Sequence, residues 1–357
     1  MSERKQHHDK RMEKIRLKRK RKKQRILIVL AESIILIILC LGAYGMNKYN
    51  KFQVVDIDTT QIQVNEGAKK EGYTTIALFG GDSREGALEA GTHADSIIVA
   101  SINNSTKEVR MVSVYRDTLL RQIDGELKKA NNAYFFGGPE EALNELNVNL
   151  DLDIMEYVTV DFKALVNTID LIGGIDVEIM EDEVEAMNDY IEETAIVSGV
   201  EANYIQESGL QHLDGAQAVT YARIRKTEGG DFRRTERQQE VLQKMIEKGV
   251  QMNLKTMNEI IDVVFPQIST SLSIKEIISL GSSLTEYTLA GTNGFPTEKG
   301  LANLDGVGSC VVPLNLDNNV IELHAFLYPE EEYTVSETVI DINTQIINMT
   351  TGFADPL

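Results

Sequence analysis

The chain has 357 residues, of which 42% are hydrophobic and 25% are charged, and its formal net charge is -19. This length suits one large domain or two modest ones, and the hydrophobic content is enough for a packed core. A chain this acidic repels phosphate polymers overall, which argues against a nucleic-acid-binding protein.

Charge is distributed unevenly along the chain. Residues 1–25 contain thirteen Lys or Arg and three acidic residues, whereas residues 26–357 contain 23 basic and 52 acidic ones. Between the two parts lies the apolar run ILIVLAESIILIILCLGAYGM, residues 26–46. As a helix it would be about 31 Å long, close to the hydrocarbon thickness of a bilayer. The sequence therefore predicts a basic cytoplasmic tail (1–25), a single transmembrane helix (26–46) and an extracellular remainder.

A cleaved signal peptide is the alternative interpretation of this run. The run is too long for one, and no clear small-residue cleavage site precedes the polar flank. Cys40 falls in the predicted span and Cys310 in the outer part, so we expect no disulfide within one chain.

The outer part begins with a polar segment, residues 47–72, that we interpret as a stalk. Three strand patterns follow, at 74–79, 94–102 and 108–115, joined by a long loop and then a turn at Asn103-Asn104, and this order suggests consecutive antiparallel pairing. Antiparallel pairing would bring together Asp82 after the first strand and Asp95 at the start of the second. Arg116, after the third strand, would reach the same rim.

The next patterns alternate between helix and strand. They predict a loop and then a helix from Pro139, a strand at 156–162, a helix closed by Gly173-Gly174, a strand at 175–179 and an acidic helical surface at 178–193. Further helices and one strand follow in residues 251–357, which we expect to pack on the preceding domain as an extension. The predicted fold is α/β, with a central mixed sheet flanked by helices.

The segment YARIRKTEGGDFRRTERQQ, residues 221–239, holds five arginines. As a strand, residues 221–225 would point Arg223 and Arg225 to one face. After Gly229-Gly230 a helix would begin near Asp231 or Thr235, with Arg234 and Gln238 on one side and Arg237 turned away. Such a cluster at a helix start suits a phosphate or diphosphate, although arginines that are solvated or paired with acidic residues are the alternative.

The rim groups together suggest phosphoryl chemistry. Two carboxylates, Asp82 and Asp95, suit a hard cation such as Mg²⁺, which shares phosphate oxygens. Arginines bind phosphate bidentately and stabilise charge on a leaving diphosphate. Asp117 is a candidate proton acceptor for an attacking hydroxyl, as are Asp82 and Asp95 if no metal is bound.

At this point the sequence closely resembles the LytR-CpsA-Psr family of Gram-positive and related bacteria. The resemblance covers most of residues 73–250 and the layout of tail, span and outer domain. It is carried, in order, by GGDSR, ADSIIVAS, VSVYRDT, KKANNAYFFGG, EYVTVDFKALVNTIDLIGGIDV, LDGAQAVTYARIR and GDFRRTERQQ.

The resemblance implies a transferase that moves a glycopolymer, such as wall teichoic acid or capsule, from a polyprenyl-diphosphate carrier to peptidoglycan through a phosphodiester linkage. It implies a catalytic domain at 73–250 and a hydrophobic tunnel for the prenyl tail. It implies Mg²⁺, or Mn²⁺, at Asp82 and Asp95, and catalytic roles for Arg84, Arg116 and Asp117. The diphosphate-binding groups that it implies are Arg116, Lys129, Arg223, Arg225, Arg234 and Gln238.

Two positions depart from the family pattern. Tyr115 stands where proline usually precedes Arg-Asp, and Arg233 stands where glycine usually precedes the matching arginine. Two other functions remain open from the sequence: a polyprenyl-diphosphate hydrolase, in which water replaces the acceptor, and a non-catalytic protein that holds lipid carriers or the cell wall.

Overall fold

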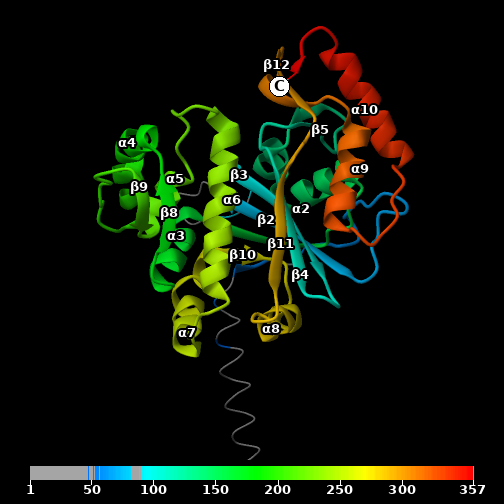
Figure 1. Cartoon of the computed structure of the whole chain (residues 1–357). Coiled ribbons are helices and arrows are strands. Elements are labelled where there is room, and N and C mark those ends of the chain that lie inside the picture. Colours follow the sequence, from blue (N-terminus) through cyan, green and yellow to red (C-terminus); the bar gives the residue numbers. More distant parts are fainter. Residues whose placement is uncertain are drawn as a thin grey trace, which may run out of the picture. The chain divides into compact units, whose positions relative to one another are not determined.

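A seven-stranded mixed sheet forms the centre of the fold (Figure 1). The computed structural model describes residues 47, 51, 53–55, 57–81, 88 and 90–356. From one edge to the other, the strands are β1 (Gln53–Val54), β10 (Ile268–Thr270), β7 (Glu156–Asp161), β2 (Tyr73–Gly81), β3 (Ala94–Asn103), β4 (Glu108–Val114) and β11 (Thr288–Phe295). Strands β2, β3 and β4 pair antiparallel in succession, as the sequence predicts.

Three helices lie on one face of this sheet: α2 (Asn131–Leu150) and α9 (Leu316–Leu327), which contact its strands, and α10 (Glu337–Thr350), which packs on both helices. Their side chains share a core with the residues of β2 and β3 that point to this face, including Phe79, Ile97 and Val99. Gly138 interrupts α2 with φ 70° and ψ -161°, so a helical segment does start at Pro139 as predicted. The residues before the break are also helical, whereas the sequence pattern predicted a loop there.

Helix α6 (Gly230–Gly249) covers the opposite face. Leu242 and Ile246 pack against Ile98, Ala100 and Met111 of the sheet. Val241 and Met245, on a different side of the helix, pack against a second cluster. That cluster is built from α3 (Phe162–Leu171), β8 (Ile175–Ile179), α4 (Glu181–Ser198), β9 (Gly209–Leu213) and α5 (Gly215–Tyr221). Figure 1 shows α6 between this group and the sheet.

The remaining elements are short or peripheral. They are β5 (Leu119–Arg121), β6 (Leu127–Lys129), α7 (Leu254–Val263), the 3₁₀ helix η1 (Phe265–Gln267), α8 (Ile274–Ser282), β12 (Lys299–Leu304), β13 (Gly308–Pro313) and β14 (Asp355–Pro356). Cys310, on β13, is buried and forms no disulfide.

The predicted strand at residues 221–225 is wrong. Tyr221 is the last residue of α5, and Arg223 and Arg225 lie in the irregular segment between α5 and α6. The reason is a capping box: the Asp214 carboxylate accepts from the Gln217 N–H at 2.8 Å, and the Gln217 side chain accepts from the Asp214 N–H at 3.0 Å. This pair starts a helix that continues into the predicted strand.

The predicted stalk, residues 47–72, is also different in the structure. Residues 52–357 form one compact unit, so the domain begins well before residue 73. Ile62 is buried, the Gln63 N–H donates to Asn144 Oδ1 at 2.6 Å, and the Asn65 side chain donates to the Val148 carbonyl at 2.9 Å. These polar residues lack periodicity because they follow the surface of α2 rather than forming an element of their own.

The predicted extension, residues 251–357, belongs to the central architecture. It supplies β10 and β11 to the sheet and two of the three helices on one face. Strand β11 pairs parallel with β4, so its partner lies far away in the chain. Within the described residues, no helix is long and apolar enough to cross a membrane; the predicted span at 26–46 lies outside them.

Candidate functional site

The ends of β2 and β3 form the rim of the candidate site. Gly81 pairs with Ala94, so the chain leaves β2 beside the point where Asp95 enters β3. This register is the one from which the sequence predicted convergence of Asp82 and Asp95. Asp82 and Arg84 themselves lie outside the described residues.

Charged side chains alternate in sign along this rim. Arg116, just after β4, donates to the Asp95 carboxylate, and its Nε lies 3.4 Å from Asp117 Oδ2. Lys129 Nζ, at the end of β6, lies 3.1 Å from Asp117 Oδ1. The structure therefore joins four predicted site residues into one chain of ion pairs.

The loop after α5 brings two more arginines to the same place. Ile224 is fully buried between them and anchors the loop. Arg225 Nη2 lies 3.9 Å from Asp95 Oδ2, which links the loop to the rim. Arg223 donates to Thr194 Oγ1 at 3.0 Å and stacks over the Phe162 ring at 4.5 Å.

Helix α6 supplies Arg234 and Gln238. They lie four residues apart on one side of the helix and line the same cavity as Arg223 and Arg225, as the sequence predicts. Arg234 is only 4% exposed, so its charge faces a largely desolvated space in which an anion is attracted strongly.

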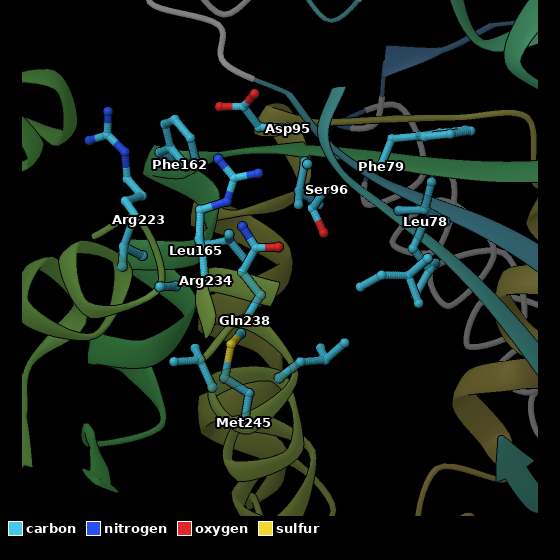
Figure 2. A pocket seen from close by; sticks show the side chains of 18 of the residues that line it. Leu78, Phe79, Asp95, Ser96, Phe162, Leu165, Arg223, Arg234, Gln238 and Met245 are labelled. Atoms are coloured by element: carbon cyan, nitrogen blue, oxygen red, sulfur yellow. The ribbon is translucent and has the colours of Figure 1, made fainter. Parts of the chain in front are cut away.

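The cavity that these groups line has a volume of about 460 Å³ and a mainly apolar wall. Figure 2 shows Asp95, Arg223 and Arg234 in the upper part of the view and Met245 in the lower part. The apolar wall combines residues of the sheet, α3 and α6: Leu78, Ile98, Val158, Val160, Leu165, Val241, Leu242 and Met245.

Sequence reasoning missed this apolar lining. The residues belong to strand and helix patterns that predict burial, and a pattern does not distinguish a buried side chain that touches core from one that lines a cavity. Along α6, however, the sequence does show how the cavity wall changes from polar to apolar. The residues in question are Arg234, Gln238, Leu242 and Met245. They run from guanidinium to amide to apolar side chains over about 16 Å of helix.

The prediction that Arg237 turns away from Gln238 holds only in part. Arg237 does not line the cavity, but it is buried, 1% exposed, rather than solvated. Its Nε donates to Glu183 Oε1 at 2.9 Å inside the α4–α6 contact. The long acidic run on α4 concealed this partner, because a solvated acidic face was the simpler interpretation.

Both departures from the family pattern have a structural account. The Tyr115 N–H donates to the Phe295 carbonyl at 3.0 Å, a bond that proline could not make. The Tyr115 ring packs edge-on against Phe232 of α6, with centroids 5.0 Å apart, and burial raises the pKa of its phenol. Arg233 pairs with Glu236 at 2.9 Å and with Glu183 at 3.5 Å and does not line the cavity.

The donor set at the rim is compatible with a hard divalent cation. Asp95 is partly exposed and lines the cavity, and Mg²⁺ commonly takes one or two carboxylates together with phosphate oxygens and water. Within the described residues no group of three or more His, Cys, Asp and Glu side chains could hold a metal. A cation here would therefore depend on Asp95, on Asp82 and on oxygens of the substrate.

The similarity to known proteins extends over most of the described domain and includes the residues of the candidate site. The family model of the LytR_cpsA_psr family matches residues 42–296, more than two thirds of the chain. The polyisoprenyl-teichoic acid–peptidoglycan teichoic acid transferase TagV of Bacillus subtilis is 31% identical over 200 residues, which are 55% of this chain and about half, 49%, of TagV. The corresponding TagU of Bacillus licheniformis is 26% identical over 76% of this chain and 86% of that protein.

A solved structure shares the fold. The structure of the LytR-CPS2A-psr protein YwtF (TagT) with bound octaprenyl pyrophosphate lipid has a TM-score of 0.55 and 19% identity. It covers 76% of this chain and 99% of that one. The family match, the relatives and the shared fold agree, and this chain belongs to the LytR-CpsA-Psr family.

Proposed function

We propose that this protein transfers a glycopolymer from a polyprenyl-diphosphate carrier to peptidoglycan. The observation that carries this proposal is one cavity that combines a cluster of arginines with an apolar wall. A polyprenyl diphosphate has the same two parts: an anionic head that suits arginines and a long apolar tail that is stable only away from water. The names of TagV and TagU supply the reaction, and the structure of TagT with octaprenyl pyrophosphate supplies a precedent for the lipid.

In the proposed reaction, a peptidoglycan hydroxyl attacks the phosphorus that carries the glycopolymer. A new oxygen–phosphorus bond forms, the bond to the polyprenyl phosphate oxygen breaks, and polyprenyl phosphate leaves. Asp117 accepts the hydroxyl proton, while Arg116, Arg223, Arg225 and Arg234 stabilise charge on the diphosphate. Lys129 and Arg116 both contact Asp117 and orient its carboxylate.

A divalent cation fits this proposal. When bound at Asp95 and Asp82, Mg²⁺ or Mn²⁺ would neutralise charge on the diphosphate oxygens. Asp95 also holds Arg116 and approaches Arg225, so the same carboxylate orders the surrounding guanidinium groups. Arg84, which lies outside the described residues, belongs to the proposed catalytic set by its place in the family motif.

The proposed location is the outer face of the cytoplasmic membrane. The basic residues 1–25 followed by the apolar run 26–46 favour a cytoplasmic tail and a single span. The acceptor, peptidoglycan, is outside the membrane, and the proposed carrier is anchored in it.

Topology provides one prediction. A chain cut after residue 50 and fused to a reporter that is active only outside the cytoplasm should give an active reporter, because the basic flank stays inside. Replacing the basic residues of the tail with Gln should reduce this activity. A reporter active only in the cytoplasm would contradict the proposed location.

The arginines provide a second prediction. Lysine keeps the charge but loses the planar fork that grips two oxygens. We expect Arg225→Lys and Arg234→Lys to slow transfer by about 10- to 1000-fold, which corresponds to roughly 1.4–4 kcal/mol in the barrier. The measurement is transfer of labelled polyprenyl-diphosphate sugar to peptidoglycan fragments, with circular dichroism as a control for folding.

Arg110 offers a matched control for these variants. It lies on β4, pairs with Glu108 at 2.9 Å and does not line the cavity. Arg110→Lys should transfer at the wild-type rate. If the cavity variants also transfer normally, the diphosphate does not bind at these arginines; release of free sugar phosphate without any acceptor product would instead favour a hydrolase.

The apolar wall provides a third prediction. Leu242→Trp should fill part of the cavity and weaken binding of a polyprenyl diphosphate at least tenfold, because each buried CH₂ group contributes about 0.8 kcal/mol. Binding of inorganic diphosphate should stay within about twofold, since the arginines are intact. Calorimetry on the full chain in lipid nanodiscs measures both affinities.

The next residue on the same helix, Gln243, is exposed and serves as the control. Gln243→Trp should bind both compounds as the wild type does. Equal loss of the two affinities in Leu242→Trp would mean that the cavity does not hold the tail.

The carboxylates provide a fourth prediction. Asp82→Ala and Asp95→Ala should lower transfer more than stability, and a chelator should have the same effect on the wild type, reversed by Mg²⁺ or Mn²⁺. Asp124→Ala, which removes an exposed carboxylate from the β5–β6 turn, is the control. Full activity of the Asp82→Ala, Asp95→Ala double variant would rule out the shared cation.

A further inference from the structure

A buried ion pair contacts the segment between α5 and α6 that carries Arg223 and Arg225. We call this segment, residues 223–229, the arginine loop. Arg237 of α6 and Glu183 of α4 are each about 1% exposed, and Arg237 Nε donates to Glu183 Oε1 at 2.9 Å. Glu183 Oε2 accepts from the Met180 N–H at 2.9 Å, so both carboxylate oxygens are engaged. Pairing two charges away from water gains little net stability, because desolvation offsets their attraction. The contacts of Arg237 point to a different role.

The other two nitrogens of the Arg237 guanidinium hold the arginine loop. Nη1 donates to the carbonyl of Ile224 at 3.0 Å, and Nη2 donates to the hydroxyl of Thr227. Ile224 is the residue between Arg223 and Arg225. Arg237 is therefore bonded to the backbone at the centre of the segment that presents both of these side chains to the cavity.

Helix α4 fixes the same loop at a second point. Thr194 on this helix accepts from Arg223 Nη1 at 3.0 Å. Helix α4 thus reaches the loop backbone through Glu183 and Arg237, which donates to the Ile224 carbonyl. It also contacts loop side chains directly, with Thr194 and Glu193 on Arg223 and Asp189 on Lys226. The loop has no regular secondary structure over residues 223–229. The Arg223 and Ile224 N–H groups donate to the Thr220 carbonyl at 2.9 and 3.2 Å, and the bond from Arg237 satisfies the Ile224 carbonyl.

We propose that Arg237, seated on Glu183, is a positioning residue that holds Arg223 and Arg225 in the geometry that binds a diphosphate. This role rests on the proposed function, since it assumes a diphosphate at those arginines. A guanidinium carries its donors on three separate nitrogens, and here each nitrogen has its own partner. An ammonium group keeps the charge, but its three donors share one nitrogen, so it cannot reach Glu183, Ile224 and Thr227 together.

The first test is a double-mutant cycle with inorganic diphosphate as the probe and the full chain in nanodiscs. Arg237→Lys and Arg225→Lys should each weaken binding about tenfold, and the double variant should lose little more than either one, because both act through the same loop. Losses that multiply to about a hundredfold would show that Arg237 acts independently of Arg225 and would overturn the proposal.

Arg233 provides the matched control. It is on the same helix, contacts the same Glu183 oxygen at 3.5 Å and makes no side-chain bond to the loop. Arg233→Lys should bind diphosphate within about twofold of the wild type. If Arg237→Lys fails to fold, Thr227→Val removes one loop contact without touching the ion pair and should weaken binding in the same direction, to a smaller extent.

Hydrogen exchange without ligand separates this inference from the proposed function. Arg237→Lys should speed amide exchange in residues 222–229, while exchange in the sheet stays unchanged. Equal exchange in the loop would overturn the positioning role even if diphosphate binding is confirmed. The wild type could bind no diphosphate and transfer no glycopolymer while Arg237→Lys still speeds exchange in the loop. That result would count against the proposed function alone.

Discussion

Helix α6 packs against two separate surfaces, with Leu242 and Ile246 on the sheet and Val241 and Met245 on the α3–α5 group. Protein interiors normally close around any empty volume, because unfilled space loses dispersion contacts. Here the two surfaces are each supported by their own core, so α6 cannot move toward one without leaving the other. The cavity of about 460 Å³ between them is therefore a consequence of the packing, and it is the feature on which the proposed lipid site depends.

The candidate site is rich in arginine although the chain as a whole is strongly acidic. In a chain with net charge -19, the arginines that line the cavity are balanced by nearby carboxylates such as Asp95 and Glu193. Partly exposed pairs of this kind contribute about 0.2–1 kcal/mol each, whereas a bidentate guanidinium–phosphate contact gains roughly 1.5–3 kcal/mol. A diphosphate can thus compete for Arg223 and Arg225, while the buried Arg237 keeps its partners.

Neighbouring arginines on α6 differ in role because their side chains contact different partners. Arg233, Arg234 and Arg237 are close in sequence, but α6 directs them to an ion pair near the surface, to the cavity and to the buried Glu183. Rotation of about 100° per residue separates Arg234 from the other two. Arg233 and Arg237, four residues apart, share a side of the helix and both reach Glu183, and they differ in how deeply the neighbouring elements bury them. Composition identifies an arginine-rich segment, and only the helical register and the neighbouring elements assign each side chain.

The sequence by itself determined the α/β class, the β2–β3–β4 meander and the convergence of Asp95 with Arg116, because strand periodicity and the order of consecutive strands are local properties. It also determined that Arg234 and Gln238 share a helix face. Only the tertiary structure decided that residues 221–225 are not a strand, that β10 and β11 complete the sheet, and that Arg237 is buried. The last two depend on partners far away in the chain: β11 lies beside β4, and Glu183 lies 54 residues from Arg237. The helix that replaces the predicted strand starts instead at the local Asp214–Gln217 capping box. A sequence pattern records which side chains are apolar or charged, whereas long-range packing determines which of them meet.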